Sequence, residues 1–409
     1  MAGDNHPDKP ISLAEALAAI EHAFAPATAV ETIPLGDAYG RILAAEIVAP
    51  IAVPAADNSA VDGYAFRHAD LAGPLRIVGT AAAGRPHPNP VGPGEAVRIF
   101  TGAVIPKGAD TVAPQEIVTA SGVSLTVPGH LSLGANRRLA GEDIAVGSRI
   151  RALGERLDAP KIGVIASVGI AKVAVYAPLR AAVFSTGDEL REGAEPLGPG
   201  QIYDSNRPVL LAMLRNLGIE ATDLGILPDR QDIIATRLAE AARTHDAVIC
   251  SAGMSVGDED HVKAAVRSLG GLDFWSVAIK PGRPIAVGRI DGKPFFGLPG
   301  NPVAMIVTFQ TIVRPALLRL AGATPSEPRR FPVTTDFHLT RRPGKREFLR
   351  CTLHPGEGHS LLARRFERGG SGVLSSVADS EGLLEVAEDI TQIAPGTTLP
   401  FIPFASLGL

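Results

Sequence analysis

The chain has 409 residues, which at roughly 100 to 200 residues per domain is enough for several domains, each with its own core. Hydrophobic residues make up 45% of it and charged residues 20%, a balance that excludes a disordered protein. The 39 Lys and Arg residues against 43 Asp and Glu residues give a net charge of -4, so we expect no basic surface that binds nucleic acid.

The cysteine count and the N-terminus indicate a compartment. Only two cysteines occur, Cys250 and Cys351, which excludes a disulfide framework or a cysteine-rich metal site and fits a reducing cytoplasm. The first ten residues are polar, unlike a signal peptide, and the longest apolar runs fall short of the ~20 residues that a membrane span needs. We therefore expect a cytoplasmic protein that does not enter a membrane.

The first half of the chain predicts two domains. Residues 12–25 should form an amphipathic helix, because Ser12 and Glu15 stand at capping-box spacing and apolar residues recur on one face. That face could pack inside its own domain or across a subunit interface. Residues 46–146 hold short β-branched runs between Pro and Gly, which predicts a β-rich domain inserted between residues 1–45 and 147–178, an N-terminal helix and connector domain.

Residues 179–327 alternate apolar strand runs with helices. Strands are expected at 181–184, 221–226, 247–250 and 274–279, and helices at 207–217, 232–243, 262–269 and 303–320. This order predicts right-handed βαβ units and a central α/β domain with a mostly parallel sheet, covered on both faces. Alternating strands return after Pro325 and Pro328, which predicts a C-terminal β domain over residues 328–409.

Four polar, glycine-rich segments follow the strands of the α/β domain, at residues 185–190, 251–260, 280–284 and 297–302. Ligands of such sheets bind beyond the carboxyl ends of the strands, so these segments should converge on one site. Their glycines, hydroxyls and free N–H groups suit an anion. Asn301 and Pro302 could contribute to that site or could serve only to start the following helix.

Charged side chains in these segments suggest how ligands could be held. Lys280 and Arg283 bracket a short Pro-Gly turn, where one anionic ligand could meet both cations. The carboxylates of Asp188, Glu189, Asp229 and Asp260 follow strand ends, and oxygen clusters of that kind suit Mg²⁺. The alternative is that these acids are solvated loop residues. The sequence contains no Walker loop, dinucleotide fingerprint or zinc motif.

The β-rich domain carries further polar motifs, at residues 57–66, 98–103 and 137–144, which combine hydroxyls, glycines, cations and carboxylates. Tight turns are one interpretation of the first motif, and a ligand contact is the other. From the residues alone, the chain is a multidomain α/β protein with a phosphate-bearing ligand and a possible requirement for Mg²⁺.

With these motifs, the chain from about residue 10 to 405 resembles the molybdopterin molybdenumtransferases, which are related to the E domain of gephyrin. The matching runs lie, in family order, at residues 57–65, 98–102, 108–110, 115–116, 141–144, 185–190, 203–206, 255–257, 278–284, 297–303, 346–350 and 371–376. The resemblance implies an elongated, L-shaped subunit of four domains. It also implies Mg²⁺-dependent insertion of molybdate into adenylylated molybdopterin with release of AMP.

The resemblance implies partners as well. It predicts a homodimer in which the β-rich domain of one subunit completes the active site of the other. Molybdopterin adenylyltransferase would supply the substrate, and apo-molybdoenzymes or their chaperones would receive the product.

The resemblance implies functional roles for particular residues. The predicted catalytic residues are Asp62, Asp143, Glu189, Asp229, Asp260 and Lys280. The predicted substrate contacts are Thr101, Arg138, Ser185, Thr186, Gly187, Ser255, Gly257, Arg283, Pro299, Gly300, Asn301, Pro302, Arg350 and Ser371. The predicted Mg²⁺ ligands are Asp188, Glu189, Asp229 and Asp260. Four of these residues, Asp62, Thr101, Arg138 and Asp143, would reach the site on the other subunit.

Three departures from the family pattern leave alternatives open. Ser276 stands where many relatives carry a Lys near the anion site, and losing that cation could cost roughly a few kcal/mol. Relatives also often have Gly at the position of Ala252 and Lys at that of Arg283. The alternatives are a non-catalytic pterin-binding scaffold and a molybdopterin adenylyltransferase, although the latter would lack the β-rich domain.

Overall fold

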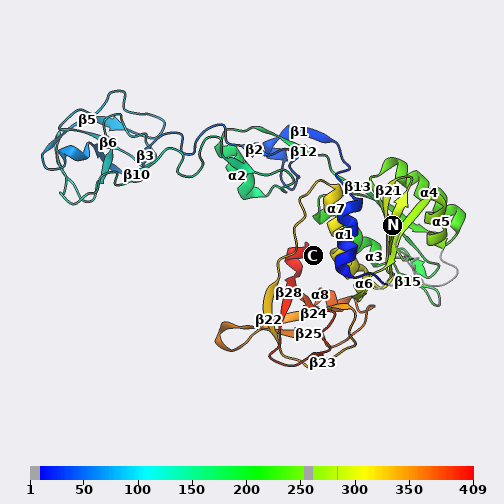
Figure 1. Ribbon diagram of the computed structural model, residues 1–409. Helices are drawn as coiled ribbons and strands as arrows, with labels where there is room; N and C mark the ends of the chain where they lie inside the picture. The colour runs from blue at the N-terminus through cyan, green and yellow to red at the C-terminus, as the bar shows by residue number, and fades with distance from the viewer. Residues whose placement is uncertain (1–9, 253–260, 283) are drawn as a thin grey trace, which may run out of the picture.

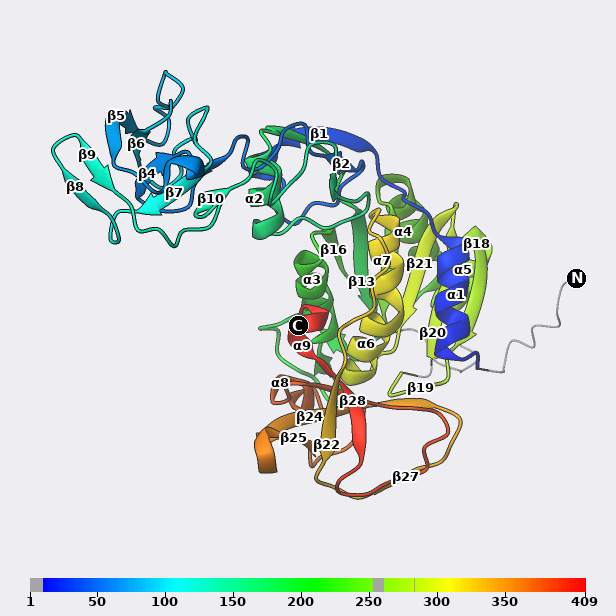
Figure 2. The same cartoon turned by 60° about the vertical axis from the view of Figure 1, so that its left-hand side comes forward.

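The molecule is elongated and L-shaped, with a β-rich domain at the end of one arm and an α/β domain stacked on a C-terminal β domain in the other (Figures 1 and 2). The computed structural model describes residues 10–252, 261–282 and 284–409. The predicted fold class, a central α/β domain with an inserted β-rich domain and a C-terminal β domain, is confirmed.

Helix α1 (Leu13–Ala23) begins at the predicted capping box. The Ser12 hydroxyl accepts a hydrogen bond from the Glu15 amide (3.1 Å), and the Glu15 carboxylate accepts one from the Ser12 amide (2.7 Å). Leu13 and Ile20 are buried in the main core, where α1 packs on α7 (Arg314–Leu320). The apolar face of the helix therefore packs within the chain, the first of the two alternatives.

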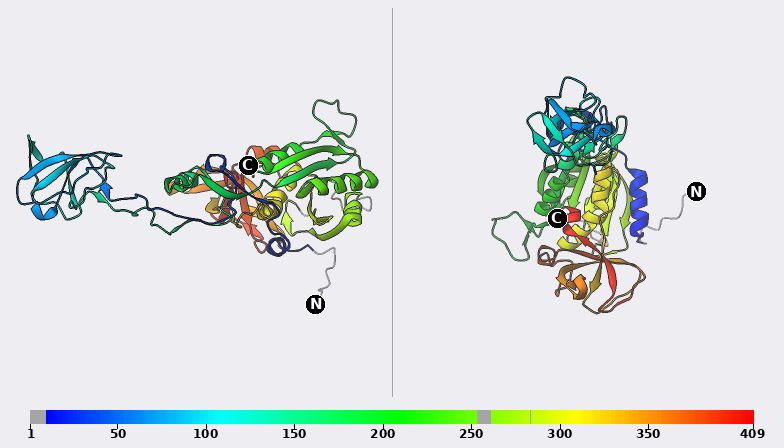
Figure 3. Two further views of the ribbon diagram at one scale, coloured as in Figure 1. Left: turned by 90° about the horizontal axis from the view of Figure 1, so that it is seen from above. Right: turned by 90° about the vertical axis from the view of Figure 1, so that its left-hand side faces the viewer.

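A narrow connector joins α1 to the β-rich domain at the end of its arm. Strand β1 (Val30–Pro34) pairs antiparallel with β12 (Lys172–Tyr176), β2 (Ile47–Val48) pairs with β11 (Arg149–Arg151), and α2 (Ala159–Ser167) packs beside them. Two chain segments run from this connector into the β-rich part, which lies well apart from the remainder of the molecule (Figure 3).

The β-rich part, which we call the distal domain (residues 54–143), is built on one six-stranded sheet. Its strand order is β7-β4-β6-β5-β9-β8. The bounds are β4 Gly63–Phe66, β5 Leu75–Ala81, β6 Glu95–Ile99, β7 Thr111–Pro114, β8 Thr119–Ser121 and β9 Ser124–Thr126. A separate pair, β3 (Asn58–Ser59) with β10 (Arg137–Arg138), brings the predicted motifs at 57–66 and 137–144 together.

The α/β domain has a six-stranded sheet of order β16-β13-β17-β21-β20-β18. Its first four strands are parallel: β16 Glu220–Leu227, β13 Arg180–Thr186, β17 Ala247–Ser251 and β21 Lys293–Leu298. Helix α3 (Asn206–Asn216) and the continuous α6 (Pro302–Thr308), η3 (Phe309–Val313) and α7 cover the face that carries Val183. Helices α4 (Gln231–Thr244) and α5 (His261–Leu269) cover the face that carries Phe184, so both faces are buried as predicted.

The other edge of this sheet differs from the prediction. The strand expected at 274–279 is β18 (Gly270–Ser276), which runs antiparallel to β20 (Pro284–Ile290). Strands β20 and β21 form a hairpin that the sequence reading missed. Its turn residues Asp291 and Gly292 both have positive φ, +47° and +79°, as a two-residue hairpin turn requires.

The C-terminal β domain is also a six-stranded sheet, of order β19-β24-β25-β22-β28-β26. Its own strands are β22 Phe331–Thr335, β24 Arg346–Pro355, β25 Leu361–Arg365, β26 Gly382–Val386 and β28 Thr398–Pro403. Strand β19 (Ile279–Lys280) comes from the α/β part of the chain and pairs with β24. This shared strand fixes the two domains against each other and places Lys280 between them.

One helical segment, Pro302–Leu320, is long and apolar enough to cross a membrane by length and composition alone. Most of it, 72% of its most apolar stretch, is buried inside the protein, as in a core helix.

Candidate active site

The described parts of the polar segments predicted to converge lie around one edge of the α/β sheet. In the parallel strands, Ser185 is in register with Ser251, and Ser251 with Leu298. The segments that leave β13, β17 and β21 therefore start side by side at the carboxyl edge.

A cavity of about 1020 Å³ opens at this edge, between the α/β domain and the C-terminal β domain. The α/β domain contributes the ends of its parallel strands and the turn after β19, and the C-terminal domain contributes β24, the end of β25 and the loop that follows it. Eight predicted site residues line the cavity: Glu189, Lys280, Pro299, Gly300, Asn301, Pro302, Arg350 and Ser371.

Lys280 projects from β19 and is held by the C-terminal domain. Its ammonium lies 2.8 Å from Glu347 Oε1, and its side chain is 59% exposed. The buried Glu347 carboxylate also accepts a hydrogen bond from Arg341 Nε (2.9 Å), and Arg341 is itself fixed by the backbone carbonyl oxygens of Ala387 (2.8 Å), Ile390 (2.5 Å) and Lys345. Glu347 thus sets the position of Lys280 while leaving its ammonium accessible.

Arg350 is a buried cation in the cavity wall. Its Nε donates to the Ser376 hydroxyl (3.0 Å) and its Nη2 to the Gly370 carbonyl (3.1 Å). Among the residues that the structure describes, no carboxylate forms an ion pair with it, and burial lowers the pKa of its guanidinium. A cation that is desolvated and unpaired gains more from an incoming anion than a solvated one does.

The Asn301 side chain does not cap the helix that follows it. Asn301 is the N-cap residue of α6 and Pro302 is at its first position, but the Asn301 side chain makes no capping hydrogen bond. Its amide lines the cavity instead, next to Ser371, whose carbonyl accepts a hydrogen bond from the Val303 amide (3.0 Å). The interpretation of Asn301 as a pure cap is therefore wrong.

Ser185, Thr186 and Gly187 lie at the end of β13, behind the cavity wall. Both hydroxyls are buried and have no hydrogen-bond partner in the described part of the chain. Gly187 has φ +146°, and a Cβ at this position would approach Glu189 Oε2 to 2.4 Å. The positive φ favours glycine at 187, and the absence of a Cβ leaves room for the Glu189 carboxylate over the strand end.

The carboxylates predicted to bind Mg²⁺ are only partly brought together. Glu189 lines the cavity, whereas Asp188 and Asp229 are not among its described lining residues. Within the described residues, no three His, Cys, Asp or Glu side chains are close enough to hold a metal ion, and Asp260 lies outside those residues. The Mg²⁺ site therefore stays a prediction. A Mg²⁺ ion that takes one or two protein carboxylates and otherwise substrate phosphate oxygens would fit Glu189.

None of the four predicted residues of the distal domain lines the described cavity. In Figures 1 and 2 the distal domain lies far from the α/β domain and the C-terminal β domain. Asp62 Oδ1 accepts hydrogen bonds from the Thr101 amide and the Thr101 hydroxyl, both at 2.8 Å. These two bonds, the backbone one first, lower the pKa of Asp62. Arg138 on β10 and Asp143 have exposed side chains.

Other sequence predictions lie outside the described residues or outside the cavity. Ser255, Gly257, Asp260 and Arg283 are not described. Ser276 ends β18, its carbonyl accepts a hydrogen bond from the Ile11 amide (3.1 Å), and it is absent from the described cavity lining. Ala252 lines the cavity with φ +73°, in the left-handed region that favours glycine.

Several residues that line the cavity were not predicted as site residues from the sequence, among them three with polar side chains. Glu347 and Arg365 line the cavity from the C-terminal domain, and Asn206 lines it from the start of α3. Asn206 is buried, and its Nδ2 donates to the Ser251 hydroxyl (2.9 Å) and the Gly300 carbonyl (2.7 Å). Asn206 and Glu347 both fall in runs that match the family, at 203–206 and 346–350. That match is the sequence signal that could have identified them as site residues.

Comparison with known proteins agrees with this architecture. The chain matches three family models, described as the MoeA N-terminal region (domain I and II) over residues 11–169, a probable molybdopterin binding domain over 182–319 and the MoeA C-terminal region (domain IV) over 332–404. It is 37% identical to a molybdopterin molybdenumtransferase of Haemophilus influenzae, over 93% of this chain and 95% of that one. It is 35% identical to molybdopterin molybdenumtransferase 2 of Mycobacterium tuberculosis, over 90% of this chain and 93% of that one.

A solved structure extends the likeness to three dimensions. The molybdopterin biosynthesis moeA protein of Pyrococcus horikoshii OT3 superposes with a TM-score of 0.83 at 28% identity, covering 97% of this chain and 100% of that one. Matches in sequence and structure therefore run through every domain, including the distal one. The chain belongs to the molybdopterin molybdenumtransferase family and is a transferase of molybdenum cofactor biosynthesis.

Proposed function

We propose that the protein inserts molybdate into adenylylated molybdopterin and releases AMP in a Mg²⁺-dependent step. The observation that carries this proposal is the cavity at the carboxyl edge of the sheet, where Lys280 and the unpaired Arg350 face one space. Molybdate, the pterin phosphate and the adenylyl phosphate are all anions. Two cations on opposite domains can therefore hold and align them.

The two cations are suited to different tasks. Arg350 is fixed by Ser376 and Gly370, so its guanidinium is preorganised and loses little freedom when it binds an oxyanion. Lys280 is accessible at the end of a flexible stem and can follow the charge that builds up as the bond between the adenylyl phosphate and the pterin phosphate breaks. Hydrogen bonds from Ser371 and Asn301 would complete the contact with the ligand.

Mg²⁺ would supply charge neutralisation of the phosphates when it is bound. Glu189 is the described carboxylate that would hold it, with Asp188, Asp229 and Asp260 as the other predicted ligands. The Gly187 turn supports this role because it lets the Glu189 carboxylate lie over the end of β13.

A homodimer with shared active sites would explain the distal group. Asp62 and Thr101 form an accessible pair that lies outside the described lining of the cavity, and Arg138 and Asp143 are exposed in the same domain. In the proposed dimer this surface completes the cavity of the other subunit. A monomer in light scattering at micromolar concentration would refute the shared site.

Subunit mixing tests the same proposal with an activity readout. Asp62→Asn and Glu189→Gln should each keep only a small residual activity, because each removes one half of every site. Dissociated and reassociated together, they should recover about a quarter of wild-type activity, since half of the dimers are mixed and carry one intact site. No recovery with dimer formation intact would contradict a site built from both subunits.

The cellular role follows from the reaction. In the cytoplasm, molybdopterin adenylyltransferase would supply the adenylylated pterin, and apo-molybdoenzymes or their chaperones would take up the finished cofactor. The proposed substrate is itself the product of an adenylylation, so the adenylyltransferase must act first. The family relationship and the cavity that contains Lys280 and Arg350 support this order of steps.

The deciding experiment is AMP release from adenylylated molybdopterin by the purified protein, with and without Mg²⁺ and molybdate, followed by activation of an apo-molybdoenzyme. Release should need both ions. Lys280→Gln should reduce it strongly, whereas Lys293→Gln should not, because Lys293 is a partly exposed cation outside the described cavity lining. Tight pterin binding without AMP release would refute insertion and favour the scaffold.

A further inference from the structure

We infer that Arg207 is a positioning residue, which holds one wall of the cavity against the α/β domain and thereby sets the position of Glu189. We call residues 187–205, which contain β14 (Leu190–Arg191) and β15 (Ile202–Tyr203), the wall segment. The part of this inference that concerns catalysis rests on the proposed function.

The wall segment forms a continuous side of the cavity. Its lining residues are Glu189, Leu190, Ile202, Tyr203, Asp204 and Ser205. Strands β14 and β15 pair with each other in parallel, with the Ile202 amide donating to the Glu189 carbonyl (2.8 Å) and the Asp204 amide to the Arg191 carbonyl (3.0 Å). The segment is therefore ordered internally and can move as a unit that carries Glu189.

Apolar packing contributes little to holding this unit in place. No residue of 187–205 belongs to any of the hydrophobic clusters of the described chain. Leu190 is buried, but Leu197, Ile202 and Tyr203 are 44%, 55% and 47% exposed. The position of the segment must therefore depend on polar contacts.

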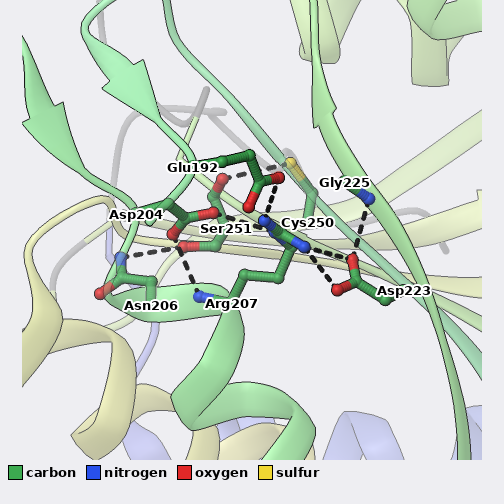
Figure 4. Close-up of polar contacts among 8 residues, drawn as sticks. All are labelled: Glu192, Asp204, Asn206, Arg207, Asp223, Gly225, Cys250 and Ser251. Carbon is green, nitrogen blue, oxygen red and sulfur yellow. Dashed lines mark hydrogen bonds and ion pairs between the residues drawn. The ribbon is translucent and has the colours of Figure 1, made fainter. Parts of the chain in front are cut away.

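Arg207, in the first turn of α3, provides those contacts (Figure 4). Its side chain is 7% exposed and binds three carboxylates: Nη2 lies 2.5 Å from Glu192 Oε1, Nε 3.0 Å from Asp204 Oδ2, and Nη1 2.5 Å from both oxygens of Asp223. Burial disfavours the charged guanidinium, but the hydrogen bonds to Asp223, Glu192 and Asp204 outweigh it and raise the pKa of Arg207.

The three carboxylates come from different parts of the site. Glu192 belongs to the wall segment, three residues after Glu189, and in the described chain it makes the one side-chain hydrogen bond that joins residues 187–203 to the body of the domain. Asp204 ends the segment. Asp223 lies on β16, where it also accepts a hydrogen bond from the Gly225 amide (2.9 Å), and β16 leads to Asp229. One guanidinium thus links the segments that carry Glu189 and Asp229.

The surplus of negative charge around Arg207 makes the inference testable without unfolding the protein. Removing Arg207 would leave several carboxylates clustered without a cation, and the variant could fail to fold. Glu192→Gln removes the negative charge that ties residues 187–203 to Arg207 and so weakens that contact, while Asp204 and Asp223 still compensate the guanidinium. Asp232→Asn is a matched control: it removes an exposed acid paired with Arg230 (2.8 Å) away from the cavity.

The first readout is hydrogen exchange and needs no activity. In Glu192→Gln, peptides covering residues 188–203 should exchange faster than in the wild type, while those of α4 stay unchanged. Asp232→Asn should leave residues 188–203 unchanged. Equal exchange of 188–203 in Glu192→Gln and the wild type would overturn the inference that Arg207 holds the wall segment.

The second readout is a double-mutant cycle on AMP release. Glu192→Gln should lower turnover roughly ten- to a hundred-fold, the effect of displacing a reactive group by about 1 Å. In a Glu189→Gln background the same substitution should have little further effect, because the positioned group is already absent. Effects that multiply independently would overturn the link to Glu189. A wild-type protein that releases no AMP would refute the proposed function, while the exchange experiment would still decide whether Arg207 holds the wall.

Discussion

Arg350 offers a quantitative test of the proposed oxyanion site. Replacing it with Met removes a desolvated cation but keeps an apolar side chain of similar length. A hydrogen bond from a charged donor contributes about 1.5–3 kcal/mol. At about 1.4 kcal/mol per factor of ten, Arg350→Met should weaken molybdate binding by about 10- to 150-fold.

Stability should change much less than binding. The substitution leaves the Ser376 hydroxyl and the Gly370 carbonyl without their donors, at about 1 kcal/mol each, but it also removes the cost of burying a charge. We therefore expect a net change in the free energy of unfolding of at most about 2 kcal/mol.

Isothermal titration with molybdate measures the binding, and urea denaturation measures the stability. Arg364→Met is the matched control, since Arg364 is on the neighbouring β25, is 62% exposed, pairs with Asp336 (3.0 Å) and is not in the described cavity lining. If Arg350→Met binds molybdate within about twofold of the wild-type affinity, Arg350 is not an oxyanion ligand. A twofold change corresponds to about 0.4 kcal/mol, which is less than the free energy that a hydrogen bond from a charged donor contributes.

Three further outcomes follow from local chemistry. Ala252→Gly should raise the free energy of unfolding by about 1 kcal/mol, as seen in urea denaturation, because it relieves a left-handed Ala. Burial raises the pKa of the Cys351 thiol to about 12, so Cys351 should resist a thiol reagent at pH 8 until the protein is unfolded. The bidentate Arg346 guanidinium holds the pKa of Glu388 below its usual value, so its stabilisation is present above about pH 4.3 and is lost as the pH falls through the lower folded pKa. Glu388→Gln should therefore lower the melting temperature at pH 7, and by progressively less as the pH falls below about 4.3. An equal loss at pH 7 and in acid would contradict the ion pair.

Periodicity predicted strands β13 and β17 of the central sheet well because both strands are buried on both faces. Their apolar runs, 181–184 and 247–250, need no knowledge of the neighbours. The hairpin of β20 and β21 was missed for a different reason. Residues 284–298 are apolar almost throughout, and only the Asp291-Gly292 pair marks the turn that divides them into two strands. That pair is a strong hairpin signal, so this error was avoidable.

The sequence predicted at which edge of the α/β sheet the site lies, but it did not predict which side chains face the cavity. Topology places Asp188, Glu189 and Asp229 at that edge, but the direction of each side chain depends on local backbone geometry, as at Gly187. The C-terminal wall could not be derived from strand order at all. It depends on β19 crossing into the C-terminal sheet, a pairing of two residues that leaves no periodic signal.

The pairing of β19 with the C-terminal sheet also explains how the Lys280 ammonium can be held in place and still be available to a ligand. Glu347 would neutralise Lys280 completely if the two formed an isolated buried pair, and an anion would then have to separate them. Arg341, however, is 4% exposed and holds Glu347 from the opposite side, so that carboxylate remains compensated when the Lys280 ammonium turns toward the cavity. The Lys280 side chain is 59% exposed and has room for that movement. Arg341 would therefore make Lys280 available to the proposed substrate, although Arg341 is not itself among the described residues that line the cavity.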